Sequence, residues 1–296
     1  MIHGKKLLSM KKKISKIVIG AANFGKKYGI NKKKLSIRKI NLILNTASKY
    51  NINIIDTAQK YGNSENIIGN LRNLYDLKII TKLPSLKKKF NNAEIYNLVF
   101  KSYKNLKKKK IEYILFHDVK DFLKDKFHNP KILNRYKGTY FRKLGVSVYS
   151  PKEFLECIKY KDLDCIQIPY NILDYRWNNM DLEKIKNEKK IEIHVRSIFL
   201  KGILPNRTEL LPYWFKDKLK LKNKLKNLSK YNKLSVFNIC VSYVFQQKWI
   251  DKIVIGFSKE KQIDEIYKMS ARKEKINLNN DYFKFLPKKI LMPKYW

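Results

Sequence analysis

Short apolar runs alternate with amphipathic segments along most of the chain. Residues 16–20 (Lys-Ile-Val-Ile-Gly) form a β-branched run that ends at a glycine-containing loop, which predicts a strand. Ser36 then precedes a segment whose apolar residues recur every three to four positions, which predicts a capped helix. The same order, strand and then helix, recurs to the end of the pattern near residue 270.

This alternation predicts eight strand and helix units. The predicted strands are residues 16–20, 53–56, 77–82, 111–117, 142–147, 165–169, 191–197 and 252–256. The predicted helices are 37–47, 64–71, 93–106, 132–136, one starting at Pro151, 180–189, 219–231, 235–246 and 259–270. Continuous apolar strands in this order are typical of an α/β fold with a closed parallel sheet, a (β/α)₈ TIM barrel.

The chain is expected to form one barrel domain over residues 1–296. Its core is expected at about 16–271, with tails at 1–13 and 277–296, and no composition shift marks a boundary. A doubly wound nucleotide-binding fold is the weaker choice, because no Gly-x-Gly-x-x-Gly or Walker-type loop follows a strand. No apolar run is long enough for a membrane span and no cleavable signal is evident, although Met10 is an alternative start to Met1.

Charge and cysteine content narrow the function classes. The formal charge of +41 comes from 66 basic and 25 acidic residues, but the excess is almost all lysine and is spread along the chain. That bias suits an A- and T-rich genome, and specific nucleic-acid sites favour arginine, so we expect at most weak, salt-sensitive polyanion binding. Three cysteines without metal-ligand spacing indicate reduced thiols, a cytoplasmic location and no bound metal.

Four titratable residues fall at or just after the ends of neighbouring predicted strands. Asp56 ends the second strand, Tyr61 follows it, Lys82 ends the third strand and His117 ends the fourth. Each one alone is more simply a turn cap, a packing residue or a surface residue. In a barrel all strand ends open onto one face, so the four side chains are expected to converge there.

The four side chains suit protonation of a carbonyl oxygen. Lys82 is expected to lower the pKa of the Tyr61 hydroxyl, and Asp56 is expected to keep Lys82 charged and aimed. His117 is expected to hydrogen-bond the carbonyl oxygen and help deliver the proton. Because no side chain supplies a hydride, a cofactor must do so.

From about Ile17 to Glu265 the sequence resembles the aldo-keto reductases. The matching stretches are 54–58 (Ile-Ile-Asp-Thr-Ala), 61–65 (Tyr-Gly-Asn-Ser-Glu), 81–82 (Thr-Lys), 115–117 (Leu-Phe-His), 145–150 (Gly-Val-Ser-Val-Tyr-Ser), 167–171 (Gln-Ile-Pro-Tyr-Asn), 195–197 (Val-Arg-Ser) with Gly202, and 254–259 (Val-Ile-Gly-Phe-Ser-Lys) with Gln262 and Glu265. The resemblance implies a (β/α)₈ barrel, NADPH-dependent carbonyl reduction, and a tetrad of Asp56, Tyr61, Lys82 and His117 with Tyr61 as the general acid. Residues 195–202 also resemble a branch often associated with bacterial surface-sugar biosynthesis.

The same resemblance places the cofactor along the barrel mouth. It implies carboxamide contacts from Ser147 and Gln167, a nicotinamide contact from Arg196, and pyrophosphate contacts near Ser197 and Gly202. The implied phosphate and adenosine contacts are Gly256, Ser258, Lys259, Gln262 and Glu265. The sequence departs from the family at Val148 and Ile266, where many members have asparagine, and at Arg196, where many have an aromatic residue. The Arg196 guanidinium could stack on the nicotinamide or reach a substrate anion.

The sequence therefore predicts an NADP-dependent reductase of a small aldehyde or ketone. Lys259 and Lys261 favour NADP over NAD, and aromatic residues at 28, 170–177 and 212–215 are expected to line the substrate pocket or to serve only in packing. The alternative is a non-catalytic NADPH-binding barrel that acts as a regulatory or interaction subunit. The oligomeric state and the natural substrate stay open.

Overall fold

The structure is a computed structural model of the whole chain. It describes residues 15–29, 34–71, 77–86, 88–107, 111–204, 207–270, 275–276, 278–279 and 281–292. The predicted N-terminal tail, residues 1–13, lies outside the described residues.

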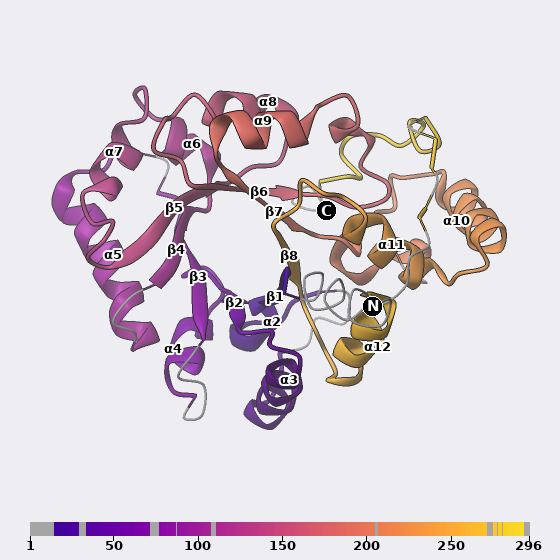
Figure 1. Cartoon of the computed structure of the whole chain (residues 1–296), viewed down its shortest axis with the longest axis horizontal. Helices are drawn as coiled ribbons and strands as arrows, with labels where there is room; N and C mark the ends of the chain where they lie inside the picture. Colours follow the sequence, from indigo (N-terminus) through magenta and orange to yellow (C-terminus); the bar gives the residue numbers. More distant parts are fainter. Residues whose placement is uncertain are drawn as a thin grey trace, which may run out of the picture.

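Eight parallel strands close into a barrel in chain order, which confirms the predicted (β/α)₈ architecture (Figure 1). The strands are β1 (Ile17–Gly20), β2 (Ile54–Asp56), β3 (Lys78–Leu83), β4 (Ile111–Phe116), β5 (Phe141–Ser147), β6 (Cys165–Pro169), β7 (Glu192–Arg196) and β8 (Lys252–Ile255). β1 pairs with both β2 and β8, so the sheet has no free edge.

Helices surround the strands on the outside of the barrel, as Figure 1 shows. They are α2 (Ala22–Gly25), α3 (Ile37–Lys49), α4 (Ser64–Gly69), α5 (Asn92–Leu106), α6 (Val119–Leu123), α7 (His128–Asn134), α8 (Pro151–Cys157), α9 (Leu182–Lys189), α10 (Lys218–Asn232), α11 (Val236–Phe245) and α12 (Lys261–Ser270), with 3₁₀ turns η1 (Tyr175–Trp177), η2 (Leu200–Gly202) and η3 (Thr208–Leu210). The helix predicted to start at Pro151 is α8, and Ser150 and Glu153 form a capping box at its start.

The apolar core has two parts. The larger part lies between the outer face of the barrel and the helices, and the smaller part fills the barrel interior. The interior residues are Val18, Ile54, Ile80, Tyr113, Leu115, Cys165 and, partly buried, Val254. The barrel is therefore a packed scaffold, and ligands are left to the loops at its ends.

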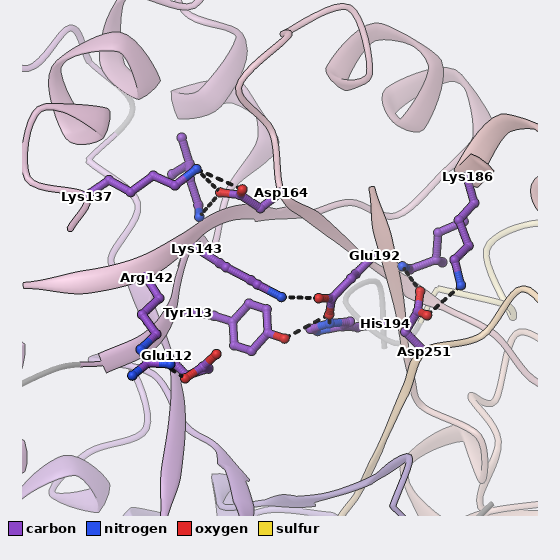
Figure 2. A network of polar contacts seen from close by, with 12 residues as sticks. Glu112, Tyr113, Lys137, Arg142, Lys143, Asp164, Lys186, Glu192, His194 and Asp251 are labelled. Carbon is purple, nitrogen blue, oxygen red and sulfur yellow. Dashed lines mark hydrogen bonds and ion pairs between the residues drawn. The ribbon is translucent and has the colours of Figure 1, made fainter. Parts of the chain in front are cut away.

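A polar network closes the barrel at the end where the strands begin (Figure 2). The Glu192 carboxylate accepts a hydrogen bond from the Tyr113 hydroxyl at 2.8 Å, pairs with Lys143, and lies 3.1 Å from His194 Nε2. Burial by itself would raise the pKa of Glu192. Contacts from His194, Lys143 and Tyr113 outweigh burial and hold that pKa below its ordinary value. Lys143 of β5 and Glu192 of β7 are thus paired far from the strand ends that carry the predicted chemistry.

Three segments differ from the sequence expectation. The helix predicted at 132–136 begins earlier, as α7 at His128, and α6 precedes it unpredicted. The last helix begins at Lys261 and not at Lys259. The described part of the C-terminal segment lacks regular helix, as expected, yet it buries Phe283, Leu286, Ile290 and Leu291 against the core.

Among the described helices, none combines the length and apolar character of a membrane span.

Candidate active site

The four predicted catalytic residues come together at the carboxyl ends of neighbouring strands. Asp56 is the last residue of β2, Lys82 lies near the end of β3, and His117 follows β4 directly. Tyr61 lies in the loop between β2 and α4. Parallel pairing of β2 with β3 and of β3 with β4 sets the three strand-borne residues side by side.

Lys82 and Asp56 form a buried ion pair. Lys82 Nζ lies 2.5 Å from Asp56 Oδ1 and also donates to the carbonyl oxygen of Thr57 at 3.1 Å. Both side chains are almost fully buried, at 1% and 4% exposure. Burial lowers the pKa of Lys82, and the Asp56 charge opposes that shift. The carboxylate therefore holds the ammonium group in place and favours its charged form.

The Tyr61 ring lies between charged and aromatic neighbours. Its centroid is 5.6 Å from Lys82 Nζ, 5.1 Å from Lys26 Nζ and 5.8 Å from the His117 ring, which it meets edge-on. Burial, reinforced by the Asp56 charge, raises the pKa of Tyr61 well above its ordinary value. The predicted lowering by Lys82 is therefore wrong for this structure, because burial of the phenol and the Asp56 charge dominate its pKa. The phenol stays protonated at neutral pH and so retains a proton to donate.

His117 is held in its neutral form. Burial and the positive charges of Lys82 and Arg196 lower its pKa to about 3. Its Nδ1 atom is buried and lacks a hydrogen-bond partner among the described residues. A neutral imidazole can donate a hydrogen bond to a substrate oxygen. It lacks the extra proton that the imidazolium form could release. This narrows the predicted role of His117 to positioning and polarising that oxygen.

Two glycines set the position of the Tyr61 loop. Gly62 has φ of +60°, a left-handed conformation that favours glycine. Gly25, in α2, approaches so closely that a Cβ atom there would lie 1.9 Å from the Tyr61 carbonyl oxygen and 2.3 Å from the Ser64 nitrogen. The Ser64 hydroxyl adds a 3.0 Å hydrogen bond to the carbonyl oxygen of Ala21. The loop is thus packed directly against the segment that follows β1.

Replacing Gly25 by alanine is expected to displace Tyr61. The new Cβ must push the two backbones apart, which should lower kcat/KM for carbonyl reduction at least tenfold and cost about 1–3 kcal/mol of stability. Gly138→Ala is the control for the kinetics alone, because nothing lies within 4 Å of the added atom, although the φ of +89° at Gly138 makes that substitution strained in itself. Steady-state kinetics and urea unfolding check both variants, and unchanged kinetics in Gly25→Ala would contradict this account of the loop.

A buried carboxylate, not singled out as functional from the sequence, anchors the helix that follows Tyr61. Glu65 is 3% exposed and accepts hydrogen bonds from Thr81 at 2.6 Å, Ser102 at 2.8 Å and Asn105 at 3.1 Å. Thr81 precedes Lys82 on β3, so this network ties the Tyr61 loop to the strand that carries Lys82. In the sequence, the Ser64-Glu65 pair indicated only the start of a helix and not this network.

The residues predicted to hold the nicotinamide lie together at the ends of β5, β6 and β7. Ser147 pairs with Gln167 in the sheet, and Arg196 Nε lies 3.4 Å from Ser147 Oγ. Gln167 Nε2 donates to Asp56 Oδ2 at 2.9 Å, whereas its buried Oε1 has no partner among the described residues. A carboxamide N–H group would satisfy that orphaned acceptor, so these residues fit a nicotinamide beside the tetrad.

The residues predicted to hold the phosphates lie in two loops. Ser197 and Gly202 follow β7 with φ of +62° and +89°, both left-handed. Gly256, Ser258 and Lys259 follow β8 and are exposed. The backbone nitrogens of Ser258 and Lys259 donate to Gln262 Oε1 at 2.8 and 3.1 Å. A phosphate at this helix start would therefore exchange places with the Gln262 side chain, while Glu265 is exposed further along α12.

Most of the aromatic residues expected as a pocket wall serve in packing. Tyr170 is 3% exposed and stacks on Tyr243 at 5.5 Å. Trp177 and Phe215 are each 2% exposed. Tyr28 and Tyr213 are exposed, at 42% and 87%. The sequence offered both readings, and packing is the outcome for Tyr170, Trp177 and Phe215.

Comparison with solved structures agrees with the barrel fold. PA4992 from Pseudomonas aeruginosa, described as an aldo-keto reductase, superposes with a TM-score of 0.64 at 20% identity, over 86% of this chain and 89% of that one. The glycerol dehydrogenase AKR11B4 from Gluconobacter oxydans gives 0.63 at 21% identity, over 95% and 92%. At these identities the two structures establish the fold. No curated protein sequence matches significantly.

The sequence profile of the Aldo/keto reductase family matches residues 16–280. That range includes every strand of the barrel and all four residues of the tetrad. The chain belongs to the aldo/keto reductase family.

Proposed function

We propose that the protein reduces an aldehyde or ketone, with Tyr61 as the general acid. The observation that carries this proposal is the phenol of Tyr61 beside the Lys82–Asp56 ion pair and the His117 ring, at the carboxyl ends of the strands. A phenol that holds its proton at neutral pH gives it up only to a developing alkoxide, whose basicity is high. Lys82, fixed by Asp56, supplies positive charge as that oxygen becomes negative.

We further propose that NADPH is the cofactor, which supplies a hydride when bound. Ser147, Gln167 and Arg196 would hold the nicotinamide end. The phosphate and adenosine end would be held by Ser197, Gly202, Gly256, Ser258, Lys259, Gln262 and Glu265. The unpartnered Gln167 Oε1 and the left-handed loop after β7 support this placement.

The preference for NADP over NAD rests on charge near α12. Lys259 and Lys261 are exposed at the start of that helix, and among the described residues neither forms an ion pair. A 2′-phosphate would attract both ammonium groups, and the helix start would add its partial positive charge. Three buried free cysteines support the proposal of a reducing, cytoplasmic location.

A screen of NADPH consumption tests the proposal against its alternative. The purified full chain is mixed with NADPH and a panel of aldehydes and ketones, including simple aldehydes and nucleotide-linked keto sugars. Turnover of any carbonyl substrate that also requires Tyr61 supports the reductase. Tight NADPH binding without turnover on the whole panel supports the non-catalytic, regulatory barrel instead.

A further inference from the structure

The barrel mouth holds an arginine without an acidic partner. Arg196, at the end of β7, is partly buried, and its guanidinium stacks on the Tyr149 ring at 4.4 Å. Its hydrogen bonds are long, 3.3–3.5 Å, and all go to neutral oxygens, those of Ser147, Val148 and Ser197. Among the described residues no carboxylate lies within ion-pair distance of it.

A second arginine shows how this chain satisfies a buried guanidinium that serves structure. Arg176 is 6% exposed and contacts both oxygens of Asp174, through Nε at 2.7 Å and through Nη2 at 2.6 Å. Arg196, which is partly buried, has no such pairing among the described residues. A charge that is partly desolvated and unpaired is costly, so its retention favours a ligand that pairs with it.

Further positive charge surrounds the same place. Lys26 Nζ lies 5.1 Å from the Tyr61 ring centroid and has no ion pair among the described residues. Lys60 is adjacent to Tyr61 in sequence and exposed. These two charges, together with Arg196 and Lys82, all act on His117. The nearby carboxylate, Asp56, is already taken by Lys82 and Gln167.

We propose that the carbonyl substrate carries an anionic group, a carboxylate or phosphate, and that Arg196 binds this group while Lys26 adds attraction. The inference rests on the proposed function and deepens it. The planar guanidinium matches the two oxygens of such a group, and a charge-assisted pair there would replace three long, neutral hydrogen bonds.

The position of Arg196 favours the substrate over the cofactor phosphates as the source of the anion. Arg196 contacts Ser147, at the proposed nicotinamide end, and its charge acts on both Tyr61 and His117. Of the proposed phosphate contacts, Ser258 and Lys259 follow β8 and start a different loop, and Ser197, which adjoins Arg196 in the chain, contacts it only at 3.5 Å. An anion on Arg196 therefore lies beside the reacting carbonyl group.

Matched substrates test the proposal. The parent, Arg196→Gln and Arg142→Gln are compared on glyceraldehyde against glyceraldehyde 3-phosphate, and on butanal against succinic semialdehyde. Arg142 is a suitable control because the same charge is lost at an exposed residue at the start of β5. Calorimetry of benzoate against benzamide, on the NADP-loaded protein, gives a readout that needs no turnover.

We expect the parent to prefer the anionic member of each pair by roughly 10- to 100-fold in kcat/KM. Arg196→Gln should bring the ratio of kcat/KM between the anionic and neutral members of each pair close to one and lose the preference for benzoate over benzamide, whereas Arg142→Gln should keep both preferences. Equal use of neutral and anionic carbonyls by the parent would overturn the proposal and leave the reductase standing. A raised KM for NADPH in Arg196→Gln with the charge preference intact would also overturn it. If no carbonyl compound is reduced, the proposed function fails. The calorimetric comparison of benzoate with benzamide still tests whether Arg196 binds an anion.

Discussion

Replacing Tyr61 by phenylalanine is expected to lower kcat by roughly 10²- to 10⁴-fold while NADPH still binds. The substitution removes only the hydroxyl, so the ring can keep its edge contact with His117 and its place beside Lys82. Without the phenol, the developing alkoxide loses its proposed proton donor, and His117 cannot replace it because burial and nearby positive charges hold it neutral, with a pKa of about 3. Single-turnover kinetics and NADPH fluorescence titration measure the two effects separately.

Tyr231→Phe is the matched control for this experiment. Tyr231 is 79% exposed on α10, so the loss of its hydroxyl should leave both turnover and cofactor binding as in the parent. If Tyr61→Phe turned over near the parent rate, Tyr61 would not be the acid. Loss of NADPH binding together with turnover would assign Tyr61 to the cofactor and not to proton transfer.

Replacing Lys82 by methionine is expected to damage both stability and activity. The change removes the ammonium group and leaves the Asp56 carboxylate buried with Gln167 as its remaining side-chain donor. Breaking a buried pair from one side costs about 3–5 kcal/mol, since the other charge stays in the protein interior. Turnover should fall by about 10²-fold or more, because positive charge no longer faces the reacting oxygen. Urea unfolding and steady-state kinetics measure the two losses.

The double variant Asp56→Asn, Lys82→Met separates the two losses. It removes the stranded carboxylate as well, so stability should recover in part while turnover stays low. Recovery of turnover in the double variant would show that Lys82 acts only by supporting the fold. A single variant Lys82→Met with unchanged stability would contradict the ion pair as described.

The periodicity of the sequence was enough to predict the barrel, because each of its strands is a local apolar run. The tetrad was predictable for the same reason: Asp56, Lys82 and His117 stand at or next to strand ends, and a barrel brings all such ends to one face. Capping at Ser36 and Ser150 was equally readable, since a cap involves neighbours only three residues apart. The bounds of the short helices α6 and α7 could not be read from the sequence, because tertiary packing of Phe122, Ile132 and Leu133 sets them.

The electrostatics of the site depended on distances that sequence does not contain. Lys82 was expected to lower the pKa of Tyr61, but Asp56 lies nearer to the ammonium group and burial raises the pKa instead. The role of Gln262 as a cap of the Ser258 and Lys259 nitrogens is likewise a matter of how one side chain folds back. The pKa of Tyr61 reflects a competition between contacts made across the fold, whereas the Gln262 cap is local and depends on which conformation that side chain adopts.

The sequence by itself determined the barrel, the order of its strands and which residues stand at their carboxyl ends, because these follow from local patterns of apolar and polar residues. Only the tertiary structure decided which charges cancel and which stay unpaired. Lys82 and Asp56 pair at 2.5 Å, Arg176 pairs with Asp174, and Arg196 is left without an acidic partner among the described residues. The physical reason is that Coulomb energies and desolvation depend on the distance between charges and on their burial. Neither quantity can be read from the positions of residues along the chain.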